Sequence, residues 1–241
     1  MLMKTVPPFL QDPSHPQARV CAACEVRQGA LFGALDPASL VRIHADIGTP
    51  ELPAETRLYA RGEPGTAVYT VRAGIVRFQR VTASGDRRIV RLAGRGDLIG
   101  QEALLHQPYA DEAVACTPVQ LCRIPRHLVG QLGQEDTELM HELMRRWQQA
   151  LERSGAWAAE LSTGVARRRV LKLLEELSRL ADVSGEIWMP RREDMGAMLG
   201  LTVETASRMV SQLRRDGVLQ SLSQRRAVLD PAALAAALQA V

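Results

Sequence analysis

Short apolar alternations punctuated by glycine and turn residues characterise the chain from about residue 33 to 135. Two examples are the segments 67–74 (AVYTVRAG) and 75–78 (IVRF), and Ser84-Gly85-Asp86 is typical of a turn between strands. Strands of this length with a turn signal every ~8–12 residues indicate a sandwich or barrel-like sheet structure. We therefore expect residues 33–135 to form a β-roll, preceded by a polar, proline-rich arm over residues 1–32.

Near residue 136 a helical period replaces this alternation. No proline occurs from Asp136 to Val165, and apolar residues recur there at alternating three- and four-residue spacings, as in a coiled-coil seam. We expect residues 136–165 to form a dimerisation helix. Its expected interface residues are Leu143, Trp147, Ala150, Ser154, Trp157 and Leu161. The alternative is an amphipathic helix that packs on its own domain.

Residues 166–241 have the pattern of a winged helix-turn-helix. A leucine-rich helix comes first, followed by a strand-like segment at 186–189, two helices joined at Gly200-Leu201, and a hairpin over 218–229 with the sequence SQRR at its tip. Thr202 is a good N-cap for the second helix of the pair, and Gly217 is a good terminator. We expect this region to form a DNA-binding domain if the second helix exposes suitable side chains.

That second helix has two distinct faces when it is projected at about 100° per residue. Its apolar face consists of Ala206, Met209, Val210 and Leu213, and its polar face of Glu204, Ser207, Arg208, Ser211 and Arg215. Arginine can bind guanine with two hydrogen bonds, and glutamate can accept one from cytosine, so the polar face suits a major groove. The expected DNA-binding residues are Thr202, Glu204, Ser207, Arg208, Ser211, Arg215, Arg225 and Arg226. The alternative is an ordinary solvated helix face.

The composition removes several other classes of protein. Hydrophobic content of 46%, charged content of 24% and a net charge of +3 are ordinary for a globular protein. No apolar run approaches the roughly 20 residues of a membrane span, and the first residues do not resemble a signal peptide. We therefore expect a cytoplasmic protein without a membrane partner. The five histidines are scattered, and neither a nucleophile elbow nor a phosphate-binding loop occurs, so we do not expect an enzyme.

Together, these features resemble the Crp–Fnr superfamily of bacterial transcription regulators over nearly the whole chain. The segment 201–208 (LTVETASR) matches the Fnr-like branch, whose recognition helix carries Glu, then Ser and Arg three and four residues on. The resemblance implies an α+β fold with a jelly roll like that of cyclic-nucleotide-binding domains, a long dimerisation helix and a winged helix-turn-helix. It also implies an activator that binds an Fnr-like palindrome of double-stranded DNA as a homodimer and contacts RNA polymerase.

Superfamily members that bind cyclic AMP hold its ribose with a Glu in a Gly-x-Glu segment and its phosphate with an Arg-Ser/Thr pair about ten residues later. The segment 100–105 (GQEALL) keeps the first element. The segment 108–113 (PYADEA) has no arginine and carries Asp111 and Glu112 instead. Because a buried phosphate facing carboxylates without a cation is disfavoured, we do not expect cyclic AMP as the effector.

Oxygen-sensing Fnr regulators bind a [4Fe–4S] cluster through three N-terminal cysteines and one cysteine before an Ile-Pro. Cys21 and Cys24 match the first N-terminal pair, and Cys122, in QLCRIP, matches the distant cysteine. The third N-terminal cysteine is absent, and Ala30, Leu31 or Phe32 stands in its place. A cluster here requires a non-cysteine fourth ligand, whereas all-cysteine ligation is usual.

The carboxylates and histidine closest in sequence to the cysteine pair are Asp12, His15, Glu25 and Asp36. The cysteines have other interpretations: a thiol oxidation switch, a zinc site, or no site at all. We expect a regulator that senses oxygen or redox state through Cys21, Cys24 and Cys122. The alternative has the same architecture without a cluster and responds to a small molecule or partner in its β-roll.

Overall fold

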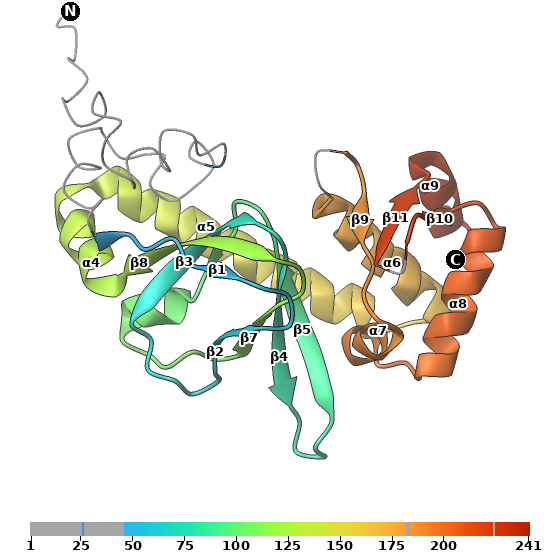
Figure 1. Cartoon of the computed structure of the whole chain (residues 1–241), viewed down its shortest axis with the longest axis horizontal. Coiled ribbons are helices and arrows are strands. Elements are labelled where there is room, and N and C mark those ends of the chain that lie inside the picture. The colour runs from blue at the N-terminus through green and yellow to red at the C-terminus, as the bar shows by residue number, and fades with distance from the viewer. Residues whose placement is uncertain (1–25, 27–45, 182–183, 224) are drawn as a thin grey trace, which may run out of the picture. The chain divides into compact units, whose positions relative to one another are not determined.

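The computed structural model describes residues 26, 46–181, 184–223 and 225–241 (Figure 1). The chain divides into two compact units: residues 1–77 with 92–150, and residues 78–91 with 151–241. Residues 78–91 therefore group with the C-terminal part of the chain. Cys21 and Cys24 lie outside the described residues.

Two four-stranded sheets form the expected β-roll (Figure 1). The first has the order β1 (Glu51–Leu52), β8 (Val119–Pro125), β3 (Ala67–Ala73) and β6 (Leu98–Ile99). The second has the order β2 (Arg57–Tyr59), β7 (Glu112–Ala115), β4 (Val76–Val81) and β5 (Arg87–Ala93). A 3-10 helix, η4 (Gln101–Leu105), follows β6.

Strand β3 is buried over five consecutive residues, Ala67 to Val71, so both of its faces are covered, because alternate residues of a strand point to opposite faces. Val68, Val71, Leu121 and Ile124 of β3 and β8 are almost fully buried, as is Phe78 of β4. The antiparallel pairing of β3 with β8 sets Thr70 opposite Cys122. Cys122 is therefore held on a rigid strand.

Helical structure begins directly after the roll. It comprises α4 (Arg126–Glu135), the long α5 (Thr137–Ala156) and a π-helical turn, η5 (Trp157–Leu161). Asp136 separates the two helices, and its carboxylate accepts a hydrogen bond from the Leu139 N–H at 3.1 Å. The helix expected over 136–165 is thus α5 continued by η5. No helix within the described ranges has both the length and the apolar content required to cross a membrane.

The C-terminal region is a winged helix-turn-helix, as expected. It contains α6 (Ala166–Arg179), β9 (Ile187–Trp188), α7 (Arg192–Leu199), α8 (Val203–Arg215), β10 (Leu219–Ser221), β11 (Arg226–Leu229) and α9 (Pro231–Gln239). The small sheet has the order β10-β11-β9. Its core is built on α6, whose Val170, Leu171, Leu173, Leu174 and Leu177 are completely buried.

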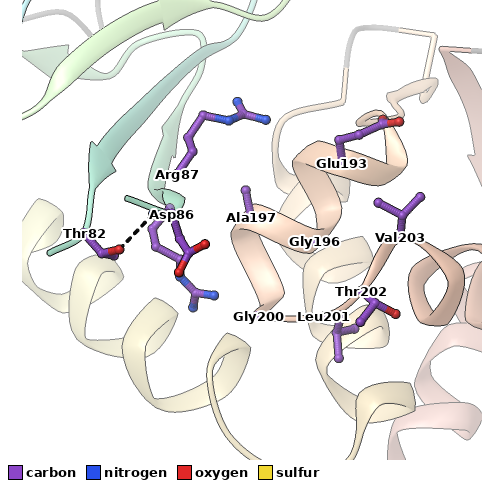
Figure 2. A pocket seen from close by; sticks show the side chains of 11 residues that line it. Thr82, Asp86, Arg87, Glu193, Gly196, Ala197, Gly200, Leu201, Thr202 and Val203 are labelled. Atoms are coloured by element: carbon purple, nitrogen blue, oxygen red, sulfur yellow. Dashed lines mark hydrogen bonds between the residues drawn. The ribbon is translucent and has the colours of Figure 1, made fainter. Parts of the chain in front are cut away.

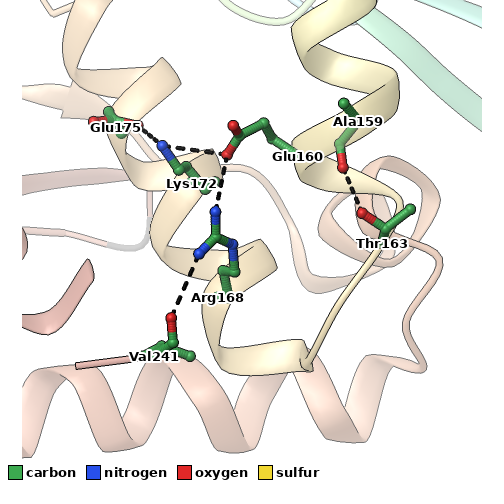
Figure 3. A network of polar contacts seen from close by, with 7 residues as sticks. All are labelled: Ala159, Glu160, Thr163, Arg168, Lys172, Glu175 and Val241. Atoms are coloured by element: carbon green, nitrogen blue, oxygen red, sulfur yellow. Dashed lines mark hydrogen bonds and ion pairs between the residues drawn. The ribbon is translucent and has the colours of Figure 1, made fainter. Parts of the chain in front are cut away.

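A polar network joins η5 to α6 and to the end of the chain (Figure 3). Glu160 lies 3.2 Å from Lys172 and 3.7 Å from Arg168, and Arg168 also donates a hydrogen bond to the Val241 carbonyl at 3.4 Å. The hydrogen bond to Glu175, followed by that to Glu160, raises the pKa of Lys172 above its usual value. These contacts fix the entry of the chain into the winged helix domain.

Candidate nucleic-acid interface

The recognition helix α8 begins and ends at defined caps. Thr202 has extended backbone angles, and its hydroxyl accepts a hydrogen bond from the Thr205 N–H at 3.2 Å. At the other end, Asp216 is the C-cap and Gly217 has a φ of +74°, a conformation that favours glycine. The N-cap and terminator predicted from the sequence are therefore confirmed.

The apolar face of α8 packs inward, which determines the face that remains outside. Ala206, Val210 and Leu213 are at most 1% exposed. The preceding turn depends on Gly200, which caps α7 in the left-handed conformation with a φ of +62°. Of the predicted recognition residues, Ser207 is half-buried and the others on the helix are exposed, namely Thr202, Glu204, Arg208, Ser211 and Arg215.

Glu204 is suited to accept hydrogen bonds. Its own backbone N–H and the Thr202 side chain hydrogen-bond to the carboxylate, and these contacts lower its pKa below the usual value. The carboxylate is therefore ionised at neutral pH and acts only as an acceptor. The outer face of α8 thus combines one acceptor, hydroxyl groups and arginine donors, the set that distinguishes bases in a major groove.

The two wing arginines have different surroundings. Arg225 lies with its guanidinium carbon 5.4 Å from the centroid of the Trp188 ring. Arg226, on β11, forms an ion pair with Glu186 at 2.6 Å, and its side chain is largely exposed. Both residues belong to the hairpin expected from the sequence. The structure places Arg225 nearer the tip and gives Arg226 a carboxylate partner within the domain.

The predicted dimer interface is divided between two faces of the helical segment. Leu143, Ala150, Trp157 and Leu161 are already buried in their own chain, whereas Trp147 and Ser154 are exposed. A different set of apolar side chains is exposed on α5, and we call it the α5 stripe: Met140, Met144, Trp147 and Leu151, each between 40% and 64% exposed. The α5 stripe repeats at spacings of four, three and four residues.

The interior of the roll near the segment 108–113 is occupied by tyrosine rings. Tyr59 and Tyr109 stack with centroids 3.8 Å apart, and the Tyr109 hydroxyl donates a hydrogen bond to the Ala67 carbonyl at 2.8 Å. Glu112 lies 3.7 Å from Arg57. Burial, followed by the neighbouring Tyr109, raises the pKa of Tyr69 to about 12. Tyrosine rings therefore fill this part of the roll, and Glu112 pairs with Arg57.

Two cysteines lie in the described part of the chain. Cys116 is buried, and Cys122 is half-buried on β8. Among the described residues, no group of three or more His, Cys, Asp or Glu side chains is arranged to hold a metal ion. Cys122 is thus the one predicted cluster ligand that can be located, since Cys21 and Cys24 lie outside the described ranges.

Two family models match the chain in the order found in the structure. The model of the cyclic nucleotide-binding domain matches residues 49–136, and the model of the Crp-like helix-turn-helix domain matches residues 168–237. The chain belongs to the Crp–Fnr superfamily of transcription regulators. The first match identifies the fold of the β-roll and leaves its ligand open.

Curated and solved members of the Crp–Fnr superfamily cover most of this chain. The nitrogen fixation regulation protein FixK of Bradyrhizobium diazoefficiens is 27% identical over 92% of this chain and 97% of its own length. The fumarate and nitrate reduction regulatory protein of Vibrio cholerae is 25% identical over 89% of this chain and 88% of its own. The structure of FixK2 from Bradyrhizobium japonicum superposes with a TM-score of 0.72, at 27% identity, over 79% of this chain and 96% of that one. These relatives are regulators and not enzymes.

Two features of this Crp–Fnr chain were missed in the sequence. Two residues of the α5 stripe were not predicted, although Met144 and Leu151 each follow directly after a residue of the predicted seam, Leu143 and Ala150. The second is Asp194, a buried carboxylate on α7. Its position beside Met195 and four residues before Met198 places it on the apolar face of the helix, and that signal was available.

Proposed function

We propose that this chain is a dimeric transcription regulator that binds an Fnr-like palindrome and responds to oxygen or redox state. The observation that carries the proposal is the polar face of α8, where the exposed Glu204 and Arg208 and the half-buried Ser207 follow a capped helix start. DNA binding through a helix-turn-helix is common to the superfamily. The palindrome, the dimer interface and the signal are the parts that require experiment.

The chemistry of α8 favours a half-site that contains a G·C base pair. Arg208 can donate two hydrogen bonds to guanine, and the ionised Glu204 can accept one from a cytosine amino group. The resemblance to the Fnr-like branch gives the half-site TTGAT. Two such helices in a symmetric dimer would contact half-sites about one helical turn, ~34 Å, apart.

The α5 stripe supports dimerisation. Met140, Met144, Trp147 and Leu151 present large apolar side chains to solvent along one line of a helix, with the spacing of a coiled-coil seam. Contiguous exposed apolar surface of this kind marks an interaction site. We expect the α5 stripe to pack against the same stripe of a second copy of the chain, because both the heptad spacing and a palindromic site require a symmetric dimer.

A redox response is supported by the placement of Cys122. This thiol is half-buried on a rigid strand, so a ligand from outside the strand can reach it, whereas Cys116 is buried. Cys21, Cys24 and Cys122 would hold a [4Fe–4S] cluster together with one non-cysteine ligand, and the cluster would supply sensitivity to oxygen. The name of the V. cholerae relative, which refers to fumarate and nitrate reduction, supports regulation linked to reductive metabolism.

One observation favours the cluster-free alternative. The side-chain amide nitrogen of Gln101, in η4 of the roll, is buried without a hydrogen-bond partner among the described residues. A buried donor of this kind is costly, and a small polar effector would satisfy it. Iron and sulfide content of protein purified without air separates the two signals, because the alternative requires neither element.

DNA binding itself is tested by fluorescence anisotropy with a labelled TTGAT palindrome. We expect tight binding to the palindrome, weaker binding to a scrambled duplex, and a large loss when five base pairs are inserted between the half-sites. The insertion rotates one half-site by about half a turn of the duplex, so a rigid dimer can engage only one of them. Equal affinity for all three duplexes would contradict sequence-specific binding.

A further inference from the structure

A short ion pair connects the β4–β5 hairpin to the first helix of the helix-turn-helix. Arg87, the first residue of β5, donates from Nη2 to Oδ1 of Asp194 at 2.7 Å. The two residues are 107 positions apart in the sequence, and both belong to the second compact unit. The side chain of Asp194 is only 5% exposed and that of Arg87 is 35% exposed.

The burial of Asp194 makes this contact a specific one. A carboxylate removed from water requires a cation or several donors close by, because desolvation of the charged form is costly. Asp194 lies in the first turn of α7, next to the completely buried Met195. Arg87 supplies the neutralising charge from outside the helix-turn-helix.

The guanidinium of Arg87 is itself held in position. Its Nη1 donates to the side-chain carbonyl of Gln79, on the neighbouring strand β4, at 3.2 Å. One guanidinium therefore bridges a cross-strand neighbour and the buried carboxylate through two different nitrogens. Because Arg87 is fixed on the hairpin in this way, the ion pair neutralises the Asp194 carboxylate and also restrains α7.

The next residue of the hairpin approaches the opposite end of α7. A Cβ atom added at Gly200 would lie 2.8 Å from Nη1 of Arg88. An open cleft of about 550 Å³ separates the hairpin from the turn, and its lining includes Thr202 and Val203, where α8 begins (Figure 2). The hairpin therefore reaches across this cleft with two side chains, Arg87 at the first turn of α7 and Arg88 near its C-cap.

We infer that the Arg87–Asp194 ion pair is a positioning contact for DNA recognition. The connection from α7 to α8 consists of residues 200–202, so the orientation of α7 sets the direction of the first turn of α8. That turn carries Glu204 and precedes Arg208. The inference rests on the proposed DNA binding and adds residues that act on the recognition helix through α7, without contacting a base.

The test is a double-mutant cycle on the full-length protein with the TTGAT palindrome. Arg87→Ala and Asp194→Asn should each lower affinity about tenfold, and the double variant should bind no more weakly than either single variant, since both changes remove the same contact. The dependence of affinity on salt should keep its slope, because neither residue touches a phosphate. Arg57→Ala, which breaks the exposed pair with Glu112 in the first unit, is the matched control and should bind normally.

Several results would overturn the inference. Additive losses in the double variant would show that the residues act separately, and a salt slope reduced by about one would make Arg87 a phosphate contact. Unchanged or increased affinity in both single variants would remove the positioning role. Should Arg87→Ala fail to fold, Asp194→Asn, which keeps the shape of the side chain, gives the measurement. If the wild-type protein has no affinity for the palindrome, the proposed function is contradicted as well. If the wild type binds normally and the variants bind equally well, this inference alone is contradicted.

Discussion

The hydroxyl of Thr202 accepts a hydrogen bond from the backbone N–H of Thr205 at 3.2 Å, and this contact caps the recognition helix. Thr202→Ala removes the acceptor and leaves an N–H of the first turn without its partner. We expect a loss of about 0.5–2 kcal/mol in the free energy of unfolding, which is typical of a lost N-cap. Chemical denaturation measures this loss. Thr202→Ser keeps the acceptor and should restore most of the stability, and equal losses in the two variants would contradict the capping role.

The position of Arg208 on the exposed face of α8 predicts a change in specificity. Arg208→Ala should cost roughly 1–3 kcal/mol of binding free energy on the palindrome and should relax the preference for guanine at one position of each half-site. Affinities for duplexes substituted at that position measure the preference. Arg225→Ala in the wing is the comparison, because loss of a phosphate contact weakens all sequences alike and lowers the salt slope. If the Arg208→Ala variant keeps the preference for guanine, Arg208 does not recognise that base.

The α5 stripe predicts where a charge disrupts the dimer. Met144→Glu would place two carboxylates next to each other in a desolvated symmetric interface, which strongly disfavours association. We expect sedimentation analysis to show monomers, and palindrome affinity to fall by at least about tenfold. Gln149→Glu adds the same charge at an exposed position outside the stripe and should leave the dimer intact.

Ala150→Glu gives the complementary result. Ala150 is buried in its own chain, so a glutamate there should lower the stability of the protomer rather than selectively separate two folded copies. A stable monomer in Ala150→Glu together with an unaffected dimer in Met144→Glu would return the interface to the face first expected from the sequence.

These two faces of one helix show what a sequence period can determine. The caps of α8 and its buried residues are local features, so Thr202, Gly217 and the inward face with Ala206 could be predicted correctly. A heptad period, in contrast, identifies an apolar face without saying which neighbour covers it. Leu143 is covered by its own chain and the adjacent Met144 is exposed, and only the folded structure separates them.

The Arg87–Asp194 pair shows a second kind of limit. Both residues are common surface types, and no local spacing connects positions 107 apart in the sequence. Asp194 could have been noticed on the apolar face of α7, but its partner depends on the packing of the hairpin. The parts of the molecule that were hardest to predict are therefore the long-range polar contacts, whereas strands, helices and the outward polar face of α8 followed from local patterns.

Tyr69 predicts a dependence of stability on alkaline pH. Burial, and then the neighbouring Tyr109, raises the pKa of Tyr69 to about 12 in the folded chain, compared with about 10 for an unfolded tyrosine. Because the fold favours the neutral phenol, this stabilisation is complete below pH 10 and is lost as the pH rises towards 12. Denaturation between pH 9 and 11.5 should show a smaller decline in the free energy of unfolding for Tyr69→Phe than for the wild type. Equal declines would assign the alkaline loss to other groups.

The cysteines predict the behaviour of the protein in air. Cys122 is a half-buried thiol on β8, and Cys21 and Cys24 would complete a three-cysteine ligand set from the N-terminal region. Since a non-cysteine ligand would have to take the place of one cysteine, the cluster should be more labile than an all-cysteine cluster. Protein purified without air should be brown and contain iron and sulfide. Cys21→Ser, Cys24→Ser and Cys122→Ser should each remove the colour, while Cys116→Ser, which changes a buried thiol outside the set, should keep it.

The same anaerobic protein can be used to test whether the cluster controls DNA binding. Loss of the cluster would release the N-terminal region from β8 and shift a two-state dimer, so exposure to air should weaken binding to the palindrome in the wild type. The Cys122→Ser variant should bind weakly with or without air, because it cannot hold the cluster in either condition. Cys116→Ser should respond to air as the wild type does. Colourless, iron-free anaerobic protein with the same DNA affinity in both conditions would refute the redox proposal, and would favour an effector that binds in the roll near Gln101.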